Sequence, residues 1–134
     1  MFYKGSCNCN QWQVEVDITK PLGDLNPRIC DCSYCKNNPS AIISDPDMVI
    51  NLVGGEITIN KNGDQLANFY CCDRCGDLLA VGCNLNGQLR GAVNPKLLRN
   101  ANQLGKPIKI QPQLLNASEK LDRWGKLWGV LSGV

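Results

Sequence analysis

Histidine is absent from the 134 residues of this chain. Its absence excludes the sites that need an imidazole group, such as Cys₂His₂ zinc fingers, Ser-His-Asp triads and Cys-His nucleophile pairs. No apolar run approaches the roughly 18 residues of a membrane-spanning helix, and the first residues lack the apolar region of a signal peptide. We therefore expect a cytoplasmic protein with no membrane partner.

Net charge is also small, at +2, but it is unevenly distributed. Residues 1–90 carry 7 basic and 10 acidic side chains, whereas residues 91–134 carry 7 basic and 2 acidic ones. The basic residues form no dense run with interleaved aromatic residues, so nucleic acid is not an expected partner. We interpret the basic C-terminal segment as a solvated face, in preference to a nucleic-acid surface or a wall for a small anionic ligand.

The hydrophobic pattern predicts one domain, residues 1–134, of the all-β class. Residues 12–18 alternate apolar and polar side chains without a break, which indicates a half-buried strand. Residues 48–53 are compatible with a strand or with one helical turn. Further strands are expected at residues 28–30, 41–43, 56–60, 66–70, 78–83, 88–93 and 108–110, with hairpins joining 56–60 to 66–70 and 78–83 to 88–93. Residues 20–28 are expected to form a loop.

A short helix is expected near the C-terminus. Leu121, Trp124, Trp128 and Leu131 recur at helical spacing, and Asn116 with Glu119 is typical of a capping pair. We interpret the tryptophans as packing anchors rather than a platform for a ligand.

Cysteine, by contrast, is abundant. The chain has nine cysteines, which favour metal binding over disulfides in a protein without a secretory signal. Zinc binds thiolates at about 2.3 Å in a tetrahedron, which short cysteine spacings fit. Eight of the nine fall in three groups: Cys7-x-Cys9, Cys30-x-Cys32-x-x-Cys35 and Cys71-Cys72-x-x-Cys75. The last group, followed by Gly76, has the pattern of a zinc knuckle, which supplies two ligands and needs two more.

The sequence leaves two ways to complete that site. Cys7 and Cys9 give a closed four-cysteine site, or two cysteines of the central group join the knuckle. We favour the first, because it leaves Cys30, Cys32 and Cys35 as a three-ligand set with an open corner, as in catalytic zinc sites. Other interpretations are one zinc with spare buried thiols, an iron–sulfur cluster, or a redox-active Cys-x-x-Cys.

Cys83 lies outside the three groups, and Cys71 adjoins the knuckle without belonging to its Cys-x-x-Cys. Cys71 and Cys83 are interpreted as small buried apolar residues on strands. Cys71 remains a possible substitute ligand.

The three groups, in this order, resemble the pattern of the glutathione-dependent formaldehyde-activating family (Gfa-like, also seen in centromere protein V). That pattern has Gly-x-Cys-x-Cys near the N-terminus, a central Cys-x-Cys-x-x-Cys and a later Cys-x-x-Cys-Gly. The resemblance covers about residues 3–95 of this chain, with Trp124 matching a late tryptophan. It departs from the family at three positions: Asp31 replaces a frequent His, Lys36 a frequent Arg and Asn10 a frequent Gly.

The resemblance implies a zinc-stabilised β-tent fold with two zinc ions per chain. Cys7, Cys9, Cys72 and Cys75 would hold the structural zinc, and Cys30, Cys32 and Cys35 the catalytic one. The implied activity is that of a carbon–sulfur lyase, which joins a thiol such as glutathione to a small aldehyde such as formaldehyde and gives an S-hydroxymethyl adduct. The implied partners are therefore a small thiol and a small aldehyde. Assembly of this chain into a homo-oligomer is compatible with the sequence.

The alternative function is a non-catalytic zinc module for protein or nucleic-acid binding. It would require a fourth protein ligand for the central group, from Cys71, Cys83 or Asp31. It would also use an exposed basic face, formed by Lys96, Arg99, Lys106, Lys109, Lys120, Arg123 and Lys126.

Overall fold

Alternating burial defines the strands of this protein. In β2, Val14 and Val16 are completely buried while Gln13 and Asp17 are exposed, as expected for a strand with one face toward a core. The computed structural model describes residues 1–30, 41–61, 66–110 and 114–134. In this part of the chain the fold is mainly β, as the sequence predicts.

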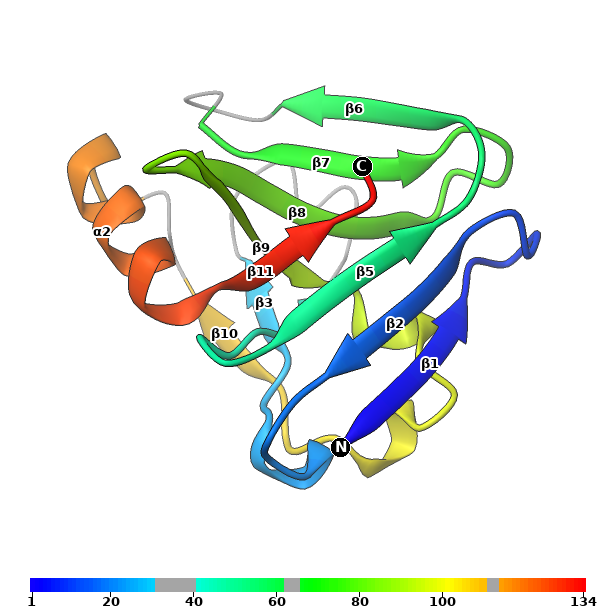
Figure 1. Ribbon diagram of the computed structural model, residues 1–134. Helices are drawn as coiled ribbons and strands as arrows, with labels where there is room; N and C mark the ends of the chain where they lie inside the picture. The colour runs from blue at the N-terminus through cyan, green and yellow to red at the C-terminus, as the bar shows by residue number, and fades with distance from the viewer. Residues whose placement is uncertain (31–40, 62–65, 111–113) are drawn as a thin grey trace.

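Eleven strands are present among the described residues, in two sheets (Figure 1). The larger sheet has eight strands in the order β1-β2-β5-β11-β9-β8-β7-β6, and the smaller has the order β10-β3-β4. The strands are β1 (Phe2–Ser6), β2 (Gln13–Asp17), β3 (Arg28–Cys30), β4 (Ala41–Ile42), β5 (Val49–Val53), β6 (Ile57–Lys61), β7 (Asn68–Cys72), β8 (Leu78–Leu85), β9 (Gln88–Val93), β10 (Ile108–Ile110) and β11 (Gly129–Ser132). The short 3₁₀ helices are η1 (Leu22–Asp24), η2 (Pro95–Leu97) and η3 (Ala101–Gln103), and the α-helix is α2 (Ala117–Leu127).

The two predicted hairpins are confirmed. β6 pairs with β7, and β8 with β9, each antiparallel. The β8–β9 turn has positive φ at both Asn86 and Gly87, which the type I′ hairpin turn requires. The turn predicted at residues 62–64 lies outside the described residues. The ambiguous segment 48–53 forms strand β5, and the loop predicted at residues 20–28 contains η1.

The C-terminal helix begins as predicted but ends early. Asn116 and Glu119 form the expected capping box, with the Asn116 side chain accepting from the Glu119 N–H and the Glu119 side chain accepting from the Asn116 N–H. The helix stops at Leu127, so the prediction that helical spacing reaches Leu131 is wrong. Leu131 lies in β11, which pairs in parallel with β5 and antiparallel with β9. No helix in the described ranges is long and apolar enough to span a membrane.

A glycine at position 129 allows this change from helix to strand. A Cβ atom there would lie 2.2 Å from the backbone oxygen of Met48, closer than real Cβ contacts come. The neighbouring Val130 N–H donates to the same oxygen at 2.9 Å, which fixes the chain against the start of β5. Close backbone pairing to β5 therefore ends the helix.

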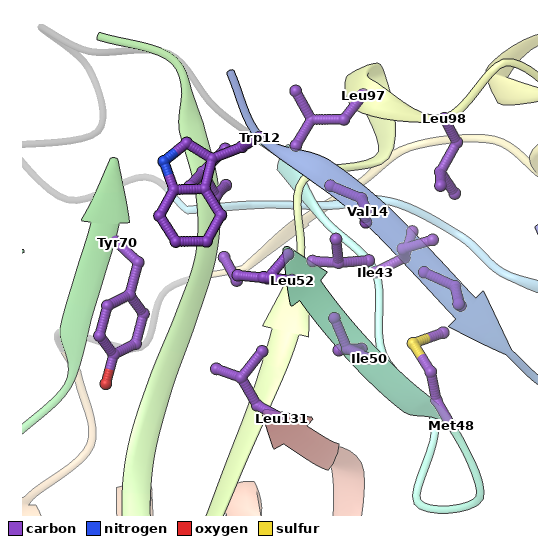
Figure 2. Packing of buried hydrophobic residues seen from close by; sticks show 14 of the residues in the cluster. Trp12, Val14, Ile43, Met48, Ile50, Leu52, Tyr70, Leu97, Leu98 and Leu131 are labelled. Atoms are coloured by element: carbon purple, nitrogen blue, oxygen red, sulfur yellow. The ribbon is translucent and has the colours of Figure 1, made fainter. Parts of the chain in front are cut away.

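Buried side chains gather on both faces of the larger sheet. Tyr70 and Ala80 belong to a first core cluster, whereas their chain neighbours Phe69 and Val81 belong to a second. Because strand neighbours point to opposite faces, the two clusters lie on opposite sides of β7 and β8. Figure 2 shows the first core cluster, which includes Trp12, Val14, Ile50, Leu52 and Leu131.

The second cluster is the helix-side cluster, because α2 residues complete it. It contains Val81, Cys83, Ala92 and Trp128, with Ile42, Leu121, Trp124 and Leu127 packed against it. Trp124 stacks on Trp128 with ring centroids 4.5 Å apart. Trp12 and Trp128 are buried. The tryptophans therefore act as packing anchors, as predicted.

Candidate metal centre

A tight turn between β1 and β2 holds the first cysteine pair. The Asn10 N–H donates to the Cys7 carbonyl at 3.0 Å, and the Cys7 N–H donates to the Trp12 carbonyl at 3.1 Å. Asn10 has φ 64°, in the left-handed region that Gly and Asn tolerate best. The asparagine at this position therefore preserves the turn. The turn brings the Cys7 and Cys9 sulfurs to 3.6 Å of each other.

A second turn, after β7, holds the knuckle pair. Cys72 is the last residue of β7, and the Gly76 N–H donates to its carbonyl at 2.9 Å. Gly76 has φ +78°, a conformation that side chains disfavour. The Cys72 N–H donates to the Asp77 carbonyl at 2.9 Å, which closes the turn toward β8. Cys75 thus returns to the side of Cys72.

The two turns meet at the same end of the larger sheet (Figure 1). The Cys9 and Cys72 sulfurs lie 3.6 Å apart, and the Asn8 N–H donates to the Asp77 carboxylate at 2.7 Å. Ligand atoms of four cysteines all lie within 4.8 Å of one another: Cys7, Cys9, Cys72 and Cys75, here called the four-cysteine cluster. A tetrahedron of sulfurs around zinc at about 2.3 Å has edges of about 3.8 Å. The cluster can therefore hold a metal ion, and its all-sulfur donor set fits zinc.

Backbone amides polarise the sulfurs of this cluster. Burial raises the pKa of the Cys72 thiol, but the backbone N–H groups of Cys75 and Arg74 and the neighbouring thiols bring it down to about 7. The backbone N–H of Gln11 lowers the pKa of Cys9, whereas burial and the three neighbouring thiols together raise it to about 11. N–H donors aimed at sulfur also favour the thiolates that bind a metal.

Cys30 is the one cysteine of the central group that lies within the described residues. Cys30 is the last residue of β3, where it pairs in register with Ile110 of β10. Cys32 and Cys35 lie outside the described residues, as do Asp31 and Lys36. The second, three-cysteine zinc site therefore stays a prediction.

The two remaining cysteines lie apart from the four-cysteine cluster. Cys83 is buried in the helix-side cluster, as predicted. Cys71 is half-buried on β7, where the side-chain amide of Asn60 lies 3.9 Å from its sulfur. Burial raises the pKa of both thiols. Neither belongs to the group of ligand atoms within 4.8 Å.

Sequence reasoning missed Asp77 as a residue of this centre. Its carboxylate accepts from the Asn8 N–H, 69 positions away, and joins the two cysteine turns. Only the close approach of the turns gives Asp77 this role, so no local motif could have indicated it.

Comparisons with known proteins support the fold. No family model matches the chain, and no curated protein matches it. Among solved structures, the crystal structure of a Rhodobacter sphaeroides protein, a structural genomics target, is similar to this chain with a TM-score of 0.60. The two are 25% identical over a match that covers 80% of this chain and 99% of that one. This similarity indicates a shared fold and assigns no activity.

Proposed function

We propose that this protein is a zinc-dependent enzyme of the Gfa-like type, which adds a glutathione-like thiol to a small aldehyde such as formaldehyde. One observation carries the proposal. The four-cysteine cluster is built from the first and third cysteine groups, Cys7 with Cys9 and Cys72 with Cys75. The cysteines of the central group are therefore available to bind a second metal ion, as in the family pattern.

In this proposal the four-cysteine cluster has a structural role. Its four sulfurs complete a tetrahedron and leave no corner for a substrate. Two of its cysteines, Cys7 and Cys72, are buried, which keeps them from solvent. Zinc held there would stabilise the fold rather than take part in the reaction.

Cys30, Cys32 and Cys35 are the proposed catalytic ligands. Zinc bound by three thiolates would lower the pKa of a thiol in the fourth position, or polarise a carbonyl oxygen. In the overall reaction the thiol sulfur bonds to the aldehyde carbon, the carbonyl π bond breaks, and the thiol proton ends on the oxygen. The three cysteines would position the thiol, since formaldehyde needs only to be aligned with it.

A non-catalytic zinc module is the second candidate. The basic residues of the C-terminal segment favour it, because all seven except Lys120 are exposed. One of them, Lys126, is held by Asp122 at 3.1 Å. A module of this kind would bind an acidic partner and would leave formaldehyde chemistry unchanged.

Exchange NMR of glutathione with formaldehyde separates the two functions. The zinc-loaded protein should accelerate exchange, and Cys35→Ser should abolish the acceleration while it remains folded. Cys71→Ser is the matched control, because Cys71 lies outside the four-cysteine cluster. If folded protein with two zinc ions gives no acceleration, the formaldehyde assignment is wrong and the zinc module becomes the better function.

A further inference from the structure

Strand β6 forms one edge of the larger sheet, and that edge is open in the part of the chain that the structure describes (Figure 1). The order of the strands ends at β6, and no described strand pairs with its outer side. The opposite edge, β1, is covered. There the Arg99 N–H donates to the Lys4 carbonyl at 3.1 Å. Gly5 also forms an isolated bridge with Leu98. Within the described ranges, the chain thus protects β1 with its own residues and has no such cover over β6.

The hydrogen bonds at the start of β6 show which of its backbone groups are used by β7. In an antiparallel pair, residues alternate between those that exchange hydrogen bonds and those that do not. The Asp73 N–H donates to the Glu56 carbonyl at 3.3 Å, so this pair is a hydrogen-bonded one. The next pair is Ile57 with Cys72, and the Cys72 N–H donates away from β6, to the Asp77 carbonyl at 2.9 Å. The Ile57 pair is therefore not hydrogen-bonded.

Alternation along β6 then assigns the remaining backbone groups. Thr58 and Asn60 exchange hydrogen bonds with β7. Ile57, Ile59 and Lys61 direct their N–H and C=O groups to the open edge. Ile59, Asn60 and Lys61 are exposed, and the exposed fraction of Ile59 is 52%. Alternate residues of β6 therefore offer both a donor and an acceptor to a further strand.

Strand β6 carries few of the features that keep strand edges from pairing. Natural proteins block such edges with proline, with a bulge or with charged side chains along the strand. The strand has no proline, and its pairing with β7 runs in regular register from Ile57 to Lys61. Its only charge is on Lys61, at the end, and its first three residues are β-branched, which favours extended pairing. The sequence of β6 therefore suits an edge that pairs with another strand.

We infer that β6 is a pairing surface for β6 of a second copy of this chain, so that two sheets join edge to edge in a two-fold dimer. Outward-facing residues must meet in the new hydrogen-bonded pairs, and the register that uses all of β6 places Ile59 opposite Ile59 of the second copy. In this register Ile57 is opposite Lys61, and Thr58 is opposite Asn60. Each of the three bonded pairs exchanges two hydrogen bonds, which gives about six in total. Such a dimer goes beyond the proposed function and does not depend on it.

Charge and side-chain chemistry favour a second copy as the occupant of this edge. The two Lys61 side chains lie at opposite ends of the paired strands, so like charges do not meet. Isoleucine meets isoleucine at the centre, and the hydroxyl of Thr58 meets the amide of Asn60. The net charge of +2 gives little repulsion between whole chains. One strand pair is smaller than the standard interface of about 1,600 Å², so we expect a dimer that forms at high concentration and dissociates on dilution.

Another exposed apolar surface of the same sheet gives different expectations. Val49 and Val53 of β5 are 47% and 54% exposed. β5 lies between β2 and β11, so both of its sides are already paired. Association through these valines would bury side chains and would leave the β6 amides as they are. Exchange of the β6 amides with solvent therefore distinguishes the two surfaces.

Amide exchange tests the pairing in the unchanged protein. NMR measures the exchange of each amide with water in zinc-loaded protein at micromolar and at millimolar concentration. The amides of Ile57, Ile59 and Lys61 should exchange several-fold more slowly in the concentrated sample, because they become donors to the second copy. The amides of Thr58 and Asn60 donate to β7 and should differ little between the samples. Exchange that is independent of concentration at the three outward amides would overturn the inference.

Sedimentation equilibrium of two charge variants tests the contact itself. Ile59→Lys places two lysines opposite one another on the two-fold axis, so it should weaken dimerisation about tenfold or more. Val53→Lys is the matched control, because it adds the same charge away from the edge at a residue of similar exposure, 54% against 52%. It should dimerise as the unchanged protein does. A protein that stays monomeric at millimolar concentration, or a dimer that persists in folded Ile59→Lys, would overturn the inference. If Ile59→Lys fails to fold, the exchange measurement on the unchanged protein decides the matter.

Discussion

The sulfurs of Cys9 and Cys72 lie 3.6 Å apart although 63 positions separate them in the chain. Cys9 belongs to the turn between β1 and β2, and Cys72 ends β7. These strands lie toward opposite edges of the eight-stranded sheet. A metal ion bound between them would therefore join two parts of the sheet that are not adjacent through hydrogen bonds.

Loss of one cluster sulfur should remove both metal and stability. On the proposal that the four-cysteine cluster holds zinc, Cys72→Ser should lose this metal and unfold largely or completely. The reason is that the binding free energy of such a site, about 10–16 kcal/mol in small zinc domains, is also folding free energy. Zinc content by mass spectrometry and an amide NMR spectrum would measure both effects. Cys71→Ser, one residue away, should keep its metal and change the free energy of unfolding by less than about 1 kcal/mol. A Cys72→Ser protein with full zinc content and an unchanged melting temperature would contradict the structural role.

Metal affinity should depend on pH in a way that the thiol pKa values determine. The pKa of Cys72 is about 7 and that of Cys9 about 11, so near pH 8 Cys72 is already a thiolate while Cys9 still carries a proton. Metal binding displaces such protons, and the affinity therefore rises with pH. Below about pH 7 the Cys72 proton must also leave, so the slope of log affinity against pH should be steeper there by about one. Competition with a chromophoric chelator from pH 6 to 9 measures the slope. A constant slope would show that the cluster does not lose its first proton in this range.

Replacing two glycines near the end of α2 with alanine should change the free energy of unfolding in opposite directions. At Gly129 a Cβ would lie 2.2 Å from the Met48 oxygen, so Gly129→Ala should lower the free energy of unfolding by about 2 kcal/mol or more. Gly125 lies in α2 with open space around its Cα, and Gly125→Ala should raise it by about 1 kcal/mol. Urea unfolding of zinc-loaded protein compares the two. Equal changes in the free energy of unfolding for the two variants would contradict the close contact between position 129 and the Met48 backbone.

Arg90 should stabilise the junction between α2 and β11. Its Nε donates to the carbonyl oxygens of Trp128 and Gly129, each at 3.1 Å. Arg90→Met keeps most of the apolar stem and removes these donors, so we expect a loss of about 1–3 kcal/mol. Exchange of the β11 amides with solvent deuterium should accelerate in this variant. Lys109→Met, which replaces an exposed cation of β10, should leave β11 exchange unchanged.

Local patterns predicted most strands of this fold, because each of these strands carries its own alternation. The alternation at residues 12–18 placed β2, and the Asn-Gly turn placed the β8–β9 hairpin. The capping pair of Asn116 and Glu119 placed the start of α2. These features depend on residues close in sequence, and the structure retains them.

Long-range pairings could not be predicted in this way. Strand β1 was missed, because its five residues lack a clear apolar alternation. In β11, Leu131 suits a helix and a strand equally by spacing. Leu131 adopts the strand conformation because β11 pairs through its backbone with β5. In this pairing Leu131 is opposite Ile50, about 80 positions earlier in the chain. No local sequence pattern indicates that β11 pairs with a strand so far away in the chain.

In the candidate site, too, local features could be predicted from the sequence and long-range contacts could not. Cysteine spacing indicated two turns that each supply a pair of ligands, and counting the ligands favoured Cys7 and Cys9 as the partners of Cys72 and Cys75. The structure brings these four sulfurs together. The residues that hold the two turns together, such as Asn8 and Asp77, depend on how the sheet brings the turns into contact.

The position of β11 also sets an order of assembly during synthesis. β11 lies between β5 and β9, so strands β1, β2 and β5 on one side and β6 to β9 on the other are joined through residues 129–132. A ribosome that has released the first hundred residues has delivered both halves without the strand that connects them. Until residues 129–132 emerge, β5 and β9 lack the strand that pairs with both of them in the folded sheet. Unpaired strand edges of this kind are prone to pair with other chains, so the late arrival of β11 prolongs the exposure of β5 and β9 to such pairing.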